Sequence, residues 1–126
     1  MRSEVDVVNV LVVDDEPMMR KMVKLTLQRR GFQVADAANA TDALALATKQ
    51  PFDLVVTDVL LGDIDGWTLA ESLAKHHSNV PLLFISGYPV DFERERQRYA
   101  TCAFLQKPFQ PGELISAISS LRLVTA

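Results

Sequence analysis

The chain has 126 residues, which suits one domain with one core, and its composition is 48% hydrophobic and 23% charged with a net charge of −3. This weak negative charge gives no electrostatic reason to expect binding to nucleic acids, which usually needs a strongly basic surface. The apolar runs are far shorter than the ~20 residues of a membrane span, and the N-terminus has no signal-peptide pattern. The single cysteine, Cys102, cannot form an internal disulfide. We therefore expect one domain over residues 1–126, with a core of about 8–123, in the cytoplasm.

Short apolar runs alternate along the chain with stretches that have the periodicity of helices. The expected strands are 9–14, 33–37, 52–58, 81–86 and 103–106, and the expected helices are 17–30, 40–49, 66–77, 90–99 and 111–122. The first, third and fourth strands are nearly continuous apolar runs, which is typical of parallel strands covered on both faces. Five strand–helix units predict an α/β fold, a doubly wound parallel sheet with helices on both faces.

Charged and polar residues stand where these strands end. Asp14 and Asp15 follow the first strand, Asp58 ends the third, Ser86 ends the fourth and Lys107 follows the fifth. The carboxyl ends of parallel strands meet at one edge of the sheet, where open α/β sheets bind their ligands. Three carboxylates at one edge repel each other unless they are protonated or bind a cation. Oxygen ligands favour a hard cation, so we predict a site for Mg²⁺ or Mn²⁺.

The same residues also suit phosphoryl transfer. A metal ion held by carboxylates can neutralise phosphoryl oxygens, and Lys107 and Ser86 offer a positive charge and a hydroxyl donor for them. Asp58, alone at the end of its strand, is the natural nucleophile. Taken singly, each residue has a simpler interpretation, such as a helix cap for Asp14 and Asp15 or a locally bonded hydroxyl for Ser86. Their occurrence at matching strand ends favours the functional interpretation.

Four motifs carry a resemblance to a known family: "LVVDDE", "DLVVTDVLLGDIDGW", "FISGY" and "FLQKPF". In this order and spacing the chain resembles the receiver domain of two-component response regulators. The sequences of the last two motifs are most similar to those of receivers attached to hybrid sensor kinases. The resemblance implies a flavodoxin-like (βα)5 fold with strand order 2-1-3-4-5. It also implies a signalling switch, not a turnover enzyme, that takes a phosphoryl group from a histidine kinase or histidine phosphotransfer protein.

The resemblance assigns roles to individual residues. It implies that Asp58 accepts the phosphoryl group and that Mg²⁺ (or Mn²⁺) is held by Asp14, Asp15, Asp58 and the backbone carbonyl of Leu60. Ser86 and Lys107 would bind the phosphoryl oxygens, and a cis peptide bond before Pro108 would direct the lysine. Phe104 stands where the family usually has an aromatic residue that moves on phosphorylation. The resemblance therefore implies that phosphorylation changes the surface formed by the fourth helix, fifth strand and fifth helix. The domain would be a monomer or a phosphorylation-dependent dimer.

Two other functions remain as alternatives. A Mg²⁺-dependent phosphohydrolase of the haloacid dehalogenase type also uses an aspartate at a strand end. Such enzymes usually have Asp-x-Asp at the first strand, whereas this chain has the adjacent pair Asp14 and Asp15. A protein-interaction domain that works without phosphorylation is the third interpretation, and the intact acidic set argues against it.

The expected first helix has two apolar stripes. Its core stripe comprises Met19, Val23 and Leu27. The second stripe is rotated by about 100° and comprises Met18, Met22 and Leu25. Either a broad core contact buries both stripes, or the second one, with Pro108 and Phe109, docks the helices of the phosphodonor. Methionines suit such an adaptable surface, and helix-in-groove contacts use this spacing.

Overall fold

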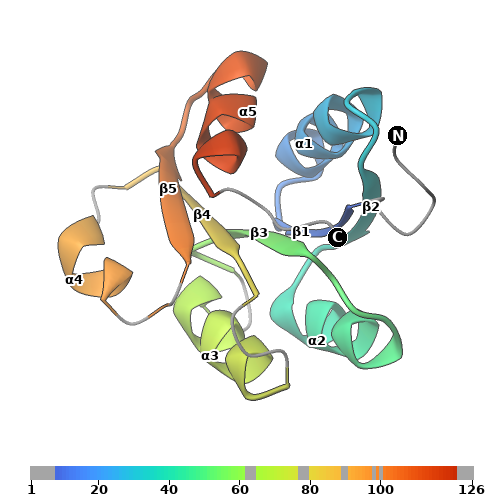
Figure 1. The fold of residues 1–126 in the computed structure, drawn as a ribbon, viewed down its shortest axis with the longest axis vertical. Coiled ribbons are helices and arrows are strands. Elements are labelled where there is room, and N and C mark those ends of the chain that lie inside the picture. Colours follow the sequence, from blue (N-terminus) through green and yellow to red (C-terminus); the bar gives the residue numbers. More distant parts are fainter. Residues whose placement is uncertain are drawn as a thin grey trace.

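The computed structural model describes residues 8–61, 65–76, 80–88, 91–97, 99 and 101–121. It contains a five-stranded parallel sheet in the order β2-β1-β3-β4-β5. Helices α1 and α5 cover one face of the sheet and α2 and α3 cover the other, while α4 lies beside the edge strand β5 (Figure 1). The predicted fold class and strand order are therefore confirmed.

The elements alternate strictly along the chain. The strands are β1 (Asn9–Val13), β2 (Gln33–Ala37), β3 (Leu54–Asp58), β4 (Leu82–Ser86) and β5 (Cys102–Gln106). The helices are α1 (Pro17–Arg29), α2 (Ala40–Lys49), α3 (Gly66–His76), α4 (Phe92–Arg96) and α5 (Pro111–Ser120). All ten elements lie where the sequence predicted them, but α4 is shorter than the predicted 90–99. Few apolar side chains in that segment are available to hold a longer helix against the sheet.

Burial explains why the central strands are so apolar. Every residue of β3 and β4 is buried, because helices cover both of their faces. Alternate residues point to opposite sides, so Val10 and Val12 join the core under α1 and α5, while Leu11 and Val13 join the core under α2 and α3. The described helices include none long and apolar enough to cross a membrane.

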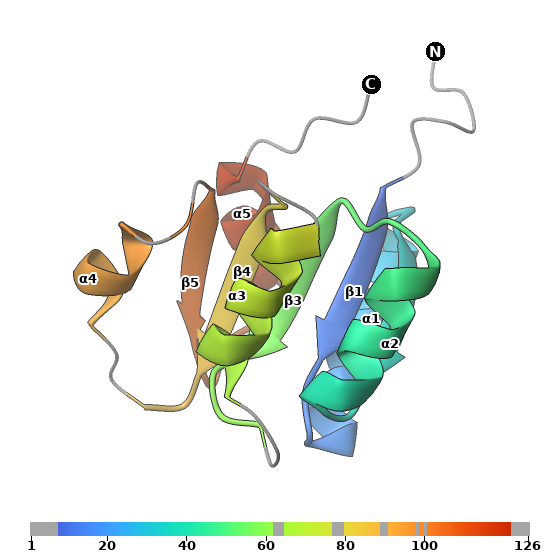
Figure 2. The same cartoon turned by 90° about the horizontal axis from the view of Figure 1, so that it is seen from below.

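The strand directions determine where a site can form. All five strands run the same way, so their arrowheads point to one edge of the sheet (Figure 2). Helix α1 begins at this edge with Pro17, directly after Glu16, and its first-turn proline fits because the first backbone N–H groups of a helix need no partner within it. The residues that follow β1, β3, β4 and β5 are thereby brought together.

Candidate functional site

Asp58 and Lys107 meet at the carboxyl edge of the sheet, although they are far apart in sequence. Asp58 is the last residue of β3 and is buried, and Lys107 follows β5. The Nζ of Lys107 donates a 2.7 Å hydrogen bond to Oδ2 of Asp58. The backbone N–H of Lys107 donates to the carbonyl of Ser86, and the peptide bond before Pro108 is cis, as expected.

The same ammonium neutralises two further carboxylates. Lys107 Nζ lies 3.0 Å from Oε1 of Glu16 and 3.3 Å from Oδ2 of Asp14. Burial acts to lower the pKa of Lys107, but the hydrogen bonds to Asp58 and Glu16 and the charge of Asp14 together raise that pKa well above its ordinary value. Lys107 is therefore fully charged at neutral pH and serves as the counter-ion of the acidic cluster.

Asp14 is the most constrained of these acids. Only 2% of it is exposed, and burial raises the pKa of its carboxyl, with Asp58 adding to the effect and the Glu16 N–H and Lys107 opposing it. Its Oδ1 accepts a 2.9 Å hydrogen bond from the backbone N–H of Glu16. Its Oδ2 has no hydrogen-bond partner among the residues that the structure describes, because the contact with Lys107 at 3.3 Å is only an ion pair. A buried oxygen of this kind is suited to a metal ligand.

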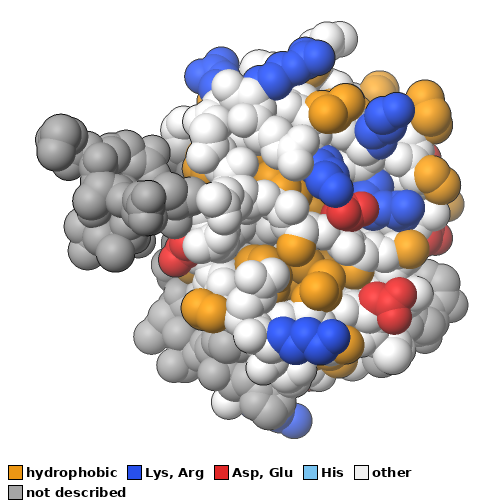
Figure 3. Space-filling model, turned by 90° about the vertical axis from the view of Figure 1, so that its right-hand side faces the viewer, with side chains coloured by type: hydrophobic (Ala, Val, Ile, Leu, Met, Phe, Trp, Pro, Cys, Tyr) orange, Lys and Arg blue, Asp and Glu red, His pale blue; other side chains and the backbone are white. Residues whose placement is uncertain are grey.

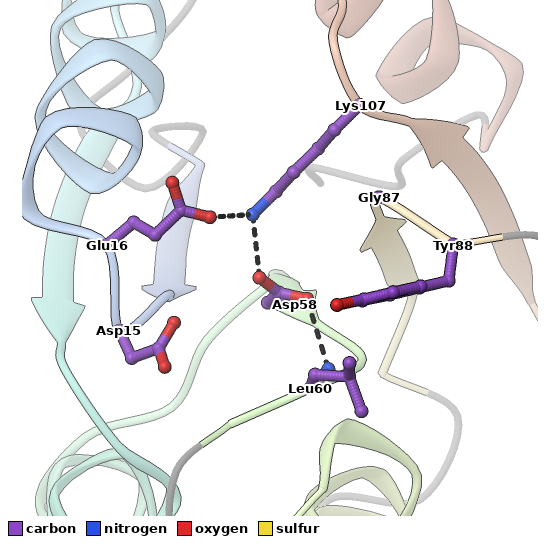
Figure 4. Close-up of a pocket in the computed structure, with 7 residues that line it drawn as sticks. All are labelled: Asp15, Glu16, Asp58, Leu60, Gly87, Tyr88 and Lys107. Carbon is purple, nitrogen blue, oxygen red and sulfur yellow. Dashed lines mark hydrogen bonds and ion pairs between the residues drawn. The ribbon is translucent and has the colours of Figure 1, made fainter.

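Three of the acids at this edge lie close enough together to hold a metal ion. Carboxylate oxygens of Asp14, Glu16 and Asp58 all lie within 4.8 Å of one another, which suits a hard divalent cation. Asp15, the other predicted ligand, is outside this close group, but it lines the same pocket and its carboxylate points into it (Figure 4). The backbone N–H of Leu60, whose carbonyl is another predicted ligand, donates to Oδ1 of Asp58 at 3.1 Å. Glu16 was not among the predicted ligands, although it is the third of three consecutive acids.

An open pocket of about 490 Å³ lies above Asp58. Its lining combines acidic, basic and apolar side chains, namely Asp15, Glu16, Asp58, Leu60, Gly87, Tyr88 and Lys107. Tyr88 extends across the pocket with its hydroxyl directed toward Asp58 (Figure 4). Tyr88 was not predicted as a site residue either; the signal for it in the sequence is an aromatic residue two positions after the strand-end Ser86. The pocket gives a small anionic group access to the Asp58 carboxylate.

Ser86 is buried at the end of β4, but its hydroxyl is engaged locally. It donates a 3.0 Å hydrogen bond to the carbonyl of Tyr88 and accepts one of 3.0 Å from the N–H of the same residue. Ser86 does not line the pocket. Binding of a phosphoryl oxygen by this hydroxyl therefore requires it to leave the Tyr88 carbonyl, because one hydroxyl has a single donor.

Phe104 belongs to an aromatic cluster beneath α3 and α4. Its ring stacks on Phe84 with centroids 5.5 Å apart and lies 6.3 Å from the ring of Trp67. The ring centroids of Trp67 and Phe84 are 4.5 Å apart, and the hydroxyl of Tyr99 donates a 3.5 Å hydrogen bond to the Trp67 carbonyl. The half-buried Phe104 is thus held by ring contacts, and any movement of it must repack this cluster.

Gly66 brings the start of α3 against the backbone of Asp58. The first residue of α3 donates its N–H to the carbonyl of Val59, and a Cβ atom at this position would overlap the carbonyl oxygen of Asp58. Only glycine permits so close an approach. Asp65 caps this helix, because its Oδ1 accepts a 2.8 Å hydrogen bond from the N–H of Thr68.

The predicted docking residues divide into two groups. Met18 is 80% exposed and Leu25 is 40% exposed, and Pro108 is exposed beside the site. Met22 is half-buried and packs against the core between α1 and α5. Phe109 is only 8% exposed and lies within that core. The expectation that Phe109 is part of an exposed surface is therefore wrong, because its ring fills the space beneath α1 and α5. Val23 and Leu27 are buried as predicted.

The comparison with protein families agrees with this geometry. The family model described as "Response regulator receiver domain" matches residues 10–119. The chain belongs to the response regulator receiver domain family. Receiver domains are signalling switches of two-component systems, and the comparisons give no support to the hydrolase alternative.

Relatives of this receiver domain occur both in a sensor kinase and in a probable transcriptional regulator. The chain is 36% identical over 115 residues to sensor kinase CckA of Brucella abortus, covering 89% of the chain and 12% of that protein. It is 33% identical over 116 residues to the probable transcriptional regulator ycf29 of Porphyra purpurea, covering 90% of the chain and 56% of that protein. The chain thus spans about half or less of the length of these relatives.

Solved receiver structures show the same architecture. The chemotaxis protein CheY4 of Vibrio cholerae superposes with a TM-score of 0.85 at 28% identity, covering 91% of this chain and 98% of that one. The receiver domain of the hybrid histidine kinase CckA gives a TM-score of 0.76 at 30% identity, covering 90% and 97% of the two chains. The receiver fold is therefore shared across nearly the whole chain.

Proposed function

We propose that Asp58 is the phosphoryl acceptor of this receiver domain. The observation that supports this most strongly is the convergence of Lys107, Asp14 and Glu16 around the buried strand-end carboxylate of Asp58, beneath an open pocket. An Oδ atom of Asp58 attacks phosphorus, the P–N bond of a phosphohistidine breaks, and its electron pair returns to the imidazole ring of the donor. The products are an aspartyl phosphate and a free histidine on the partner.

The chain's own residues prepare that step. Lys107 now bridges Asp58 and Glu16, and it shifts to the incoming phosphoryl oxygens as a positive point charge. Ser86 exchanges its bond to Tyr88 for another phosphoryl oxygen. Asp14, Asp15, Asp58 and the Leu60 carbonyl would hold Mg²⁺, and the carboxylate of Glu16 lies close enough to those of Asp14 and Asp58 to take part. When bound, Mg²⁺ supplies charge neutralisation for the transferred group.

The transfer is stoichiometric and no substrate is turned over. The test is incubation with a small acyl phosphate and Mg²⁺, with an aryl phosphate ester in a parallel reaction. We expect at most one phosphate per chain from the acyl donor, Mg²⁺ dependence of the labelling, and no sustained hydrolysis of the ester. Sustained release of phosphate from the ester would instead support a hydrolase.

The phosphodonor is proposed to be a histidine kinase or histidine phosphotransfer protein that docks on α1. The exposed apolar side chains of Leu60 and Tyr88 line the pocket, and Met18 is exposed at the start of α1, two residues after the pocket residue Glu16. Helix α1 also carries Arg20, Lys21, Lys24 and Arg29 and no acidic residue. On the face of the molecule where α1 and β2 lie, Lys and Arg side chains are interspersed with hydrophobic ones (Figure 3). A partner surface that is apolar around its histidine and acidic at its margin fits this pattern.

The docking surface is tested by Met18→Glu in an assay of phosphoryl transfer from the partner protein. We expect slower transfer from the protein partner, with labelling by a small acyl phosphate and the melting temperature unchanged. The control is Ala45→Glu, which adds the same charge at an exposed position of α2, on the opposite face of the sheet. Equal transfer rates in the two variants would contradict docking at Met18.

A further inference from the structure

Arg20 makes two contacts that phosphoryl transfer does not explain. Its Nη1 donates a 2.8 Å hydrogen bond to the backbone carbonyl of Asp14. Its Nε donates one of 3.0 Å to Oδ2 of Asp36 on β2. One guanidinium group thereby joins α1, the end of β1 and the edge strand β2, and only 21% of the side chain is exposed.

The carbonyl that Arg20 holds belongs to the peptide group between Asp14 and Asp15. The orientation of this group determines the direction in which both side chains leave the main chain. The N–H of Asp14 is held separately, by the carbonyl of Ala37 at 3.2 Å. The carbonyl and the N–H of Asp14 are therefore both fixed, and the partner of the carbonyl comes from a side chain.

We propose that Arg20 is a positioning residue of the metal site. Asp36 anchors the guanidinium, the guanidinium holds the Asp14–Asp15 peptide, and the peptide directs the two carboxylates toward the place where Mg²⁺ binds. This inference rests on the proposed function, because it requires Mg²⁺ to bind there. Lysine cannot take over the role fully, since it lacks the planar fork that serves two acceptors in fixed directions.

Charge and position make opposite predictions for Arg20. A cation near the site repels Mg²⁺, so removing Arg20 would strengthen Mg²⁺ binding if its charge were all that mattered. If Arg20 positions the carboxylates, removing it weakens Mg²⁺ binding. Loss of a residue that orients metal ligands typically costs about 10-fold to 100-fold in affinity. The direction of the change therefore decides between the two roles.

Lys24 provides a matched control. Its Nζ lies 3.0 Å from Oδ1 of Asp36, the same carboxylate that Arg20 binds, but it makes no hydrogen bond to Asp14 among the contacts that the structure describes. Arg20→Gln and Lys24→Gln each remove one positive charge and one ion pair with Asp36. Only the first removes the hydrogen bond to the Asp14 carbonyl.

The experiment is calorimetric titration of the full chain with Mg²⁺, at a temperature where all variants are folded. We expect Arg20→Gln to bind Mg²⁺ about tenfold more weakly than wild type, Arg20→Lys to lose less, and Lys24→Gln to bind as tightly as wild type or slightly more tightly. Unchanged or tighter binding by Arg20→Gln would overturn the proposal. If wild type itself bound no Mg²⁺, the proposed function would be at fault.

Asp36→Ala extends the test to the anchor and remains informative if Arg20→Gln does not fold. We expect Asp36→Ala to weaken Mg²⁺ binding although it has no place among the metal ligands. The double variant with Arg20→Lys should be scarcely weaker than Asp36→Ala alone, because the two side chains act as one unit. Fully additive losses would show that Arg20 does not act through its contact with Asp36, and would contradict the proposal.

Discussion

The ammonium nitrogen of Lys107 lies 2.7 Å from Oδ2 of Asp58, at the carboxyl ends of β3 and β5. This contact links the proposed acceptor to the strand that carries Phe104, three residues before the lysine. It also gives the acidic cluster an internal cation in the absence of a metal. Mg²⁺ held by the proposed ligands would compete with Lys107 for the same carboxylates, and a phosphoryl group on Asp58 would provide new partners for both.

Lys107→Met tests this competition. Three carboxylates lose their counter-ion, so the metal-free domain should be less stable by about 3 kcal/mol, as when one partner of a buried ion pair is removed. Mg²⁺ should restore much of that stability and bind more tightly than to wild type. Acyl phosphate should still label the variant, but slowly. Thermal unfolding with EDTA and with Mg²⁺ measures the first two effects, and equal stability of the two metal-free proteins would contradict the role of Lys107.

Asp14→Asn tests the cost of burying a charge. Because the pKa of Asp14 is raised in the folded state above 3.8, the folded state binds the proton more tightly. Its contribution to stability is thus greatest below pH 3.8 and declines as the pH rises through the folded pKa. At pH 7 without metal, Asp14→Asn should be more stable than wild type, and the difference should shrink as the pH falls. Denaturant unfolding in EDTA at several pH values measures this, and a constant difference would count against it.

Gly66→Ala tests the contact between α3 and the end of β3, where the proposed acceptor Asp58 lies. A methyl group would overlap the carbonyl oxygen of Asp58, so we expect a loss of about 1–3 kcal/mol in stability. Slower labelling by acyl phosphate should accompany it, because the backbone of Asp58 must shift. Gly112→Ala is the control: it lies in the first turn of α5, and an added Cβ would meet nothing within 4 Å. Equal stabilities of the two variants would show that the contact is unimportant.

Much of this molecule could be predicted from the sequence because hydrophobic periodicity and strand ends are local signals. The continuous apolar runs before Asp14 and Asp58 predicted buried parallel strands, and the rule that ligands bind at the carboxyl ends then brought the acids and Lys107 together. The strand order 2-1-3-4-5 came from the family resemblance. Periodicity identifies the strands but does not order them.

The features that could not be predicted from the sequence depend on the directions in which side chains point. Phe109 follows exposed Pro108, and its burial is decided by the packing of α1 against α5. In the sequence, Glu16 looks like an acidic residue at the start of a helix. Its hydrogen bond from Lys107 in the structure shows that it belongs to the site. Arg20 is one of several basic residues on α1, and its partner on β2 becomes visible only when the register of the sheet is known.

A phosphoryl mimic bound at Asp58 should change the environment of the aromatic cluster. Ser86 must release the Tyr88 carbonyl, and Lys107 must leave Glu16, so the loop after β4 and the end of β5 should both move. We expect amide chemical shifts of Gly87, Tyr88 and Cys102–Gln106 to change, together with the fluorescence of Trp67. The outer strand β2 should change little. Fixed shifts around β5 would exclude this face as the output of the switch.

The most direct test of phosphoryl acceptance is to locate the phosphate after labelling with a small acyl phosphate and Mg²⁺. Peptide mass spectrometry should find one phosphate, on Asp58, and the label should be acid-stable and lost in alkali, as expected of a carboxylic–phosphoric anhydride. Asp58→Asn should abolish labelling, while Asp15→Asn should weaken it by impairing Mg²⁺ binding. A phosphate on Ser86 or on a histidine in the wild-type chain would contradict Asp58 as the acceptor.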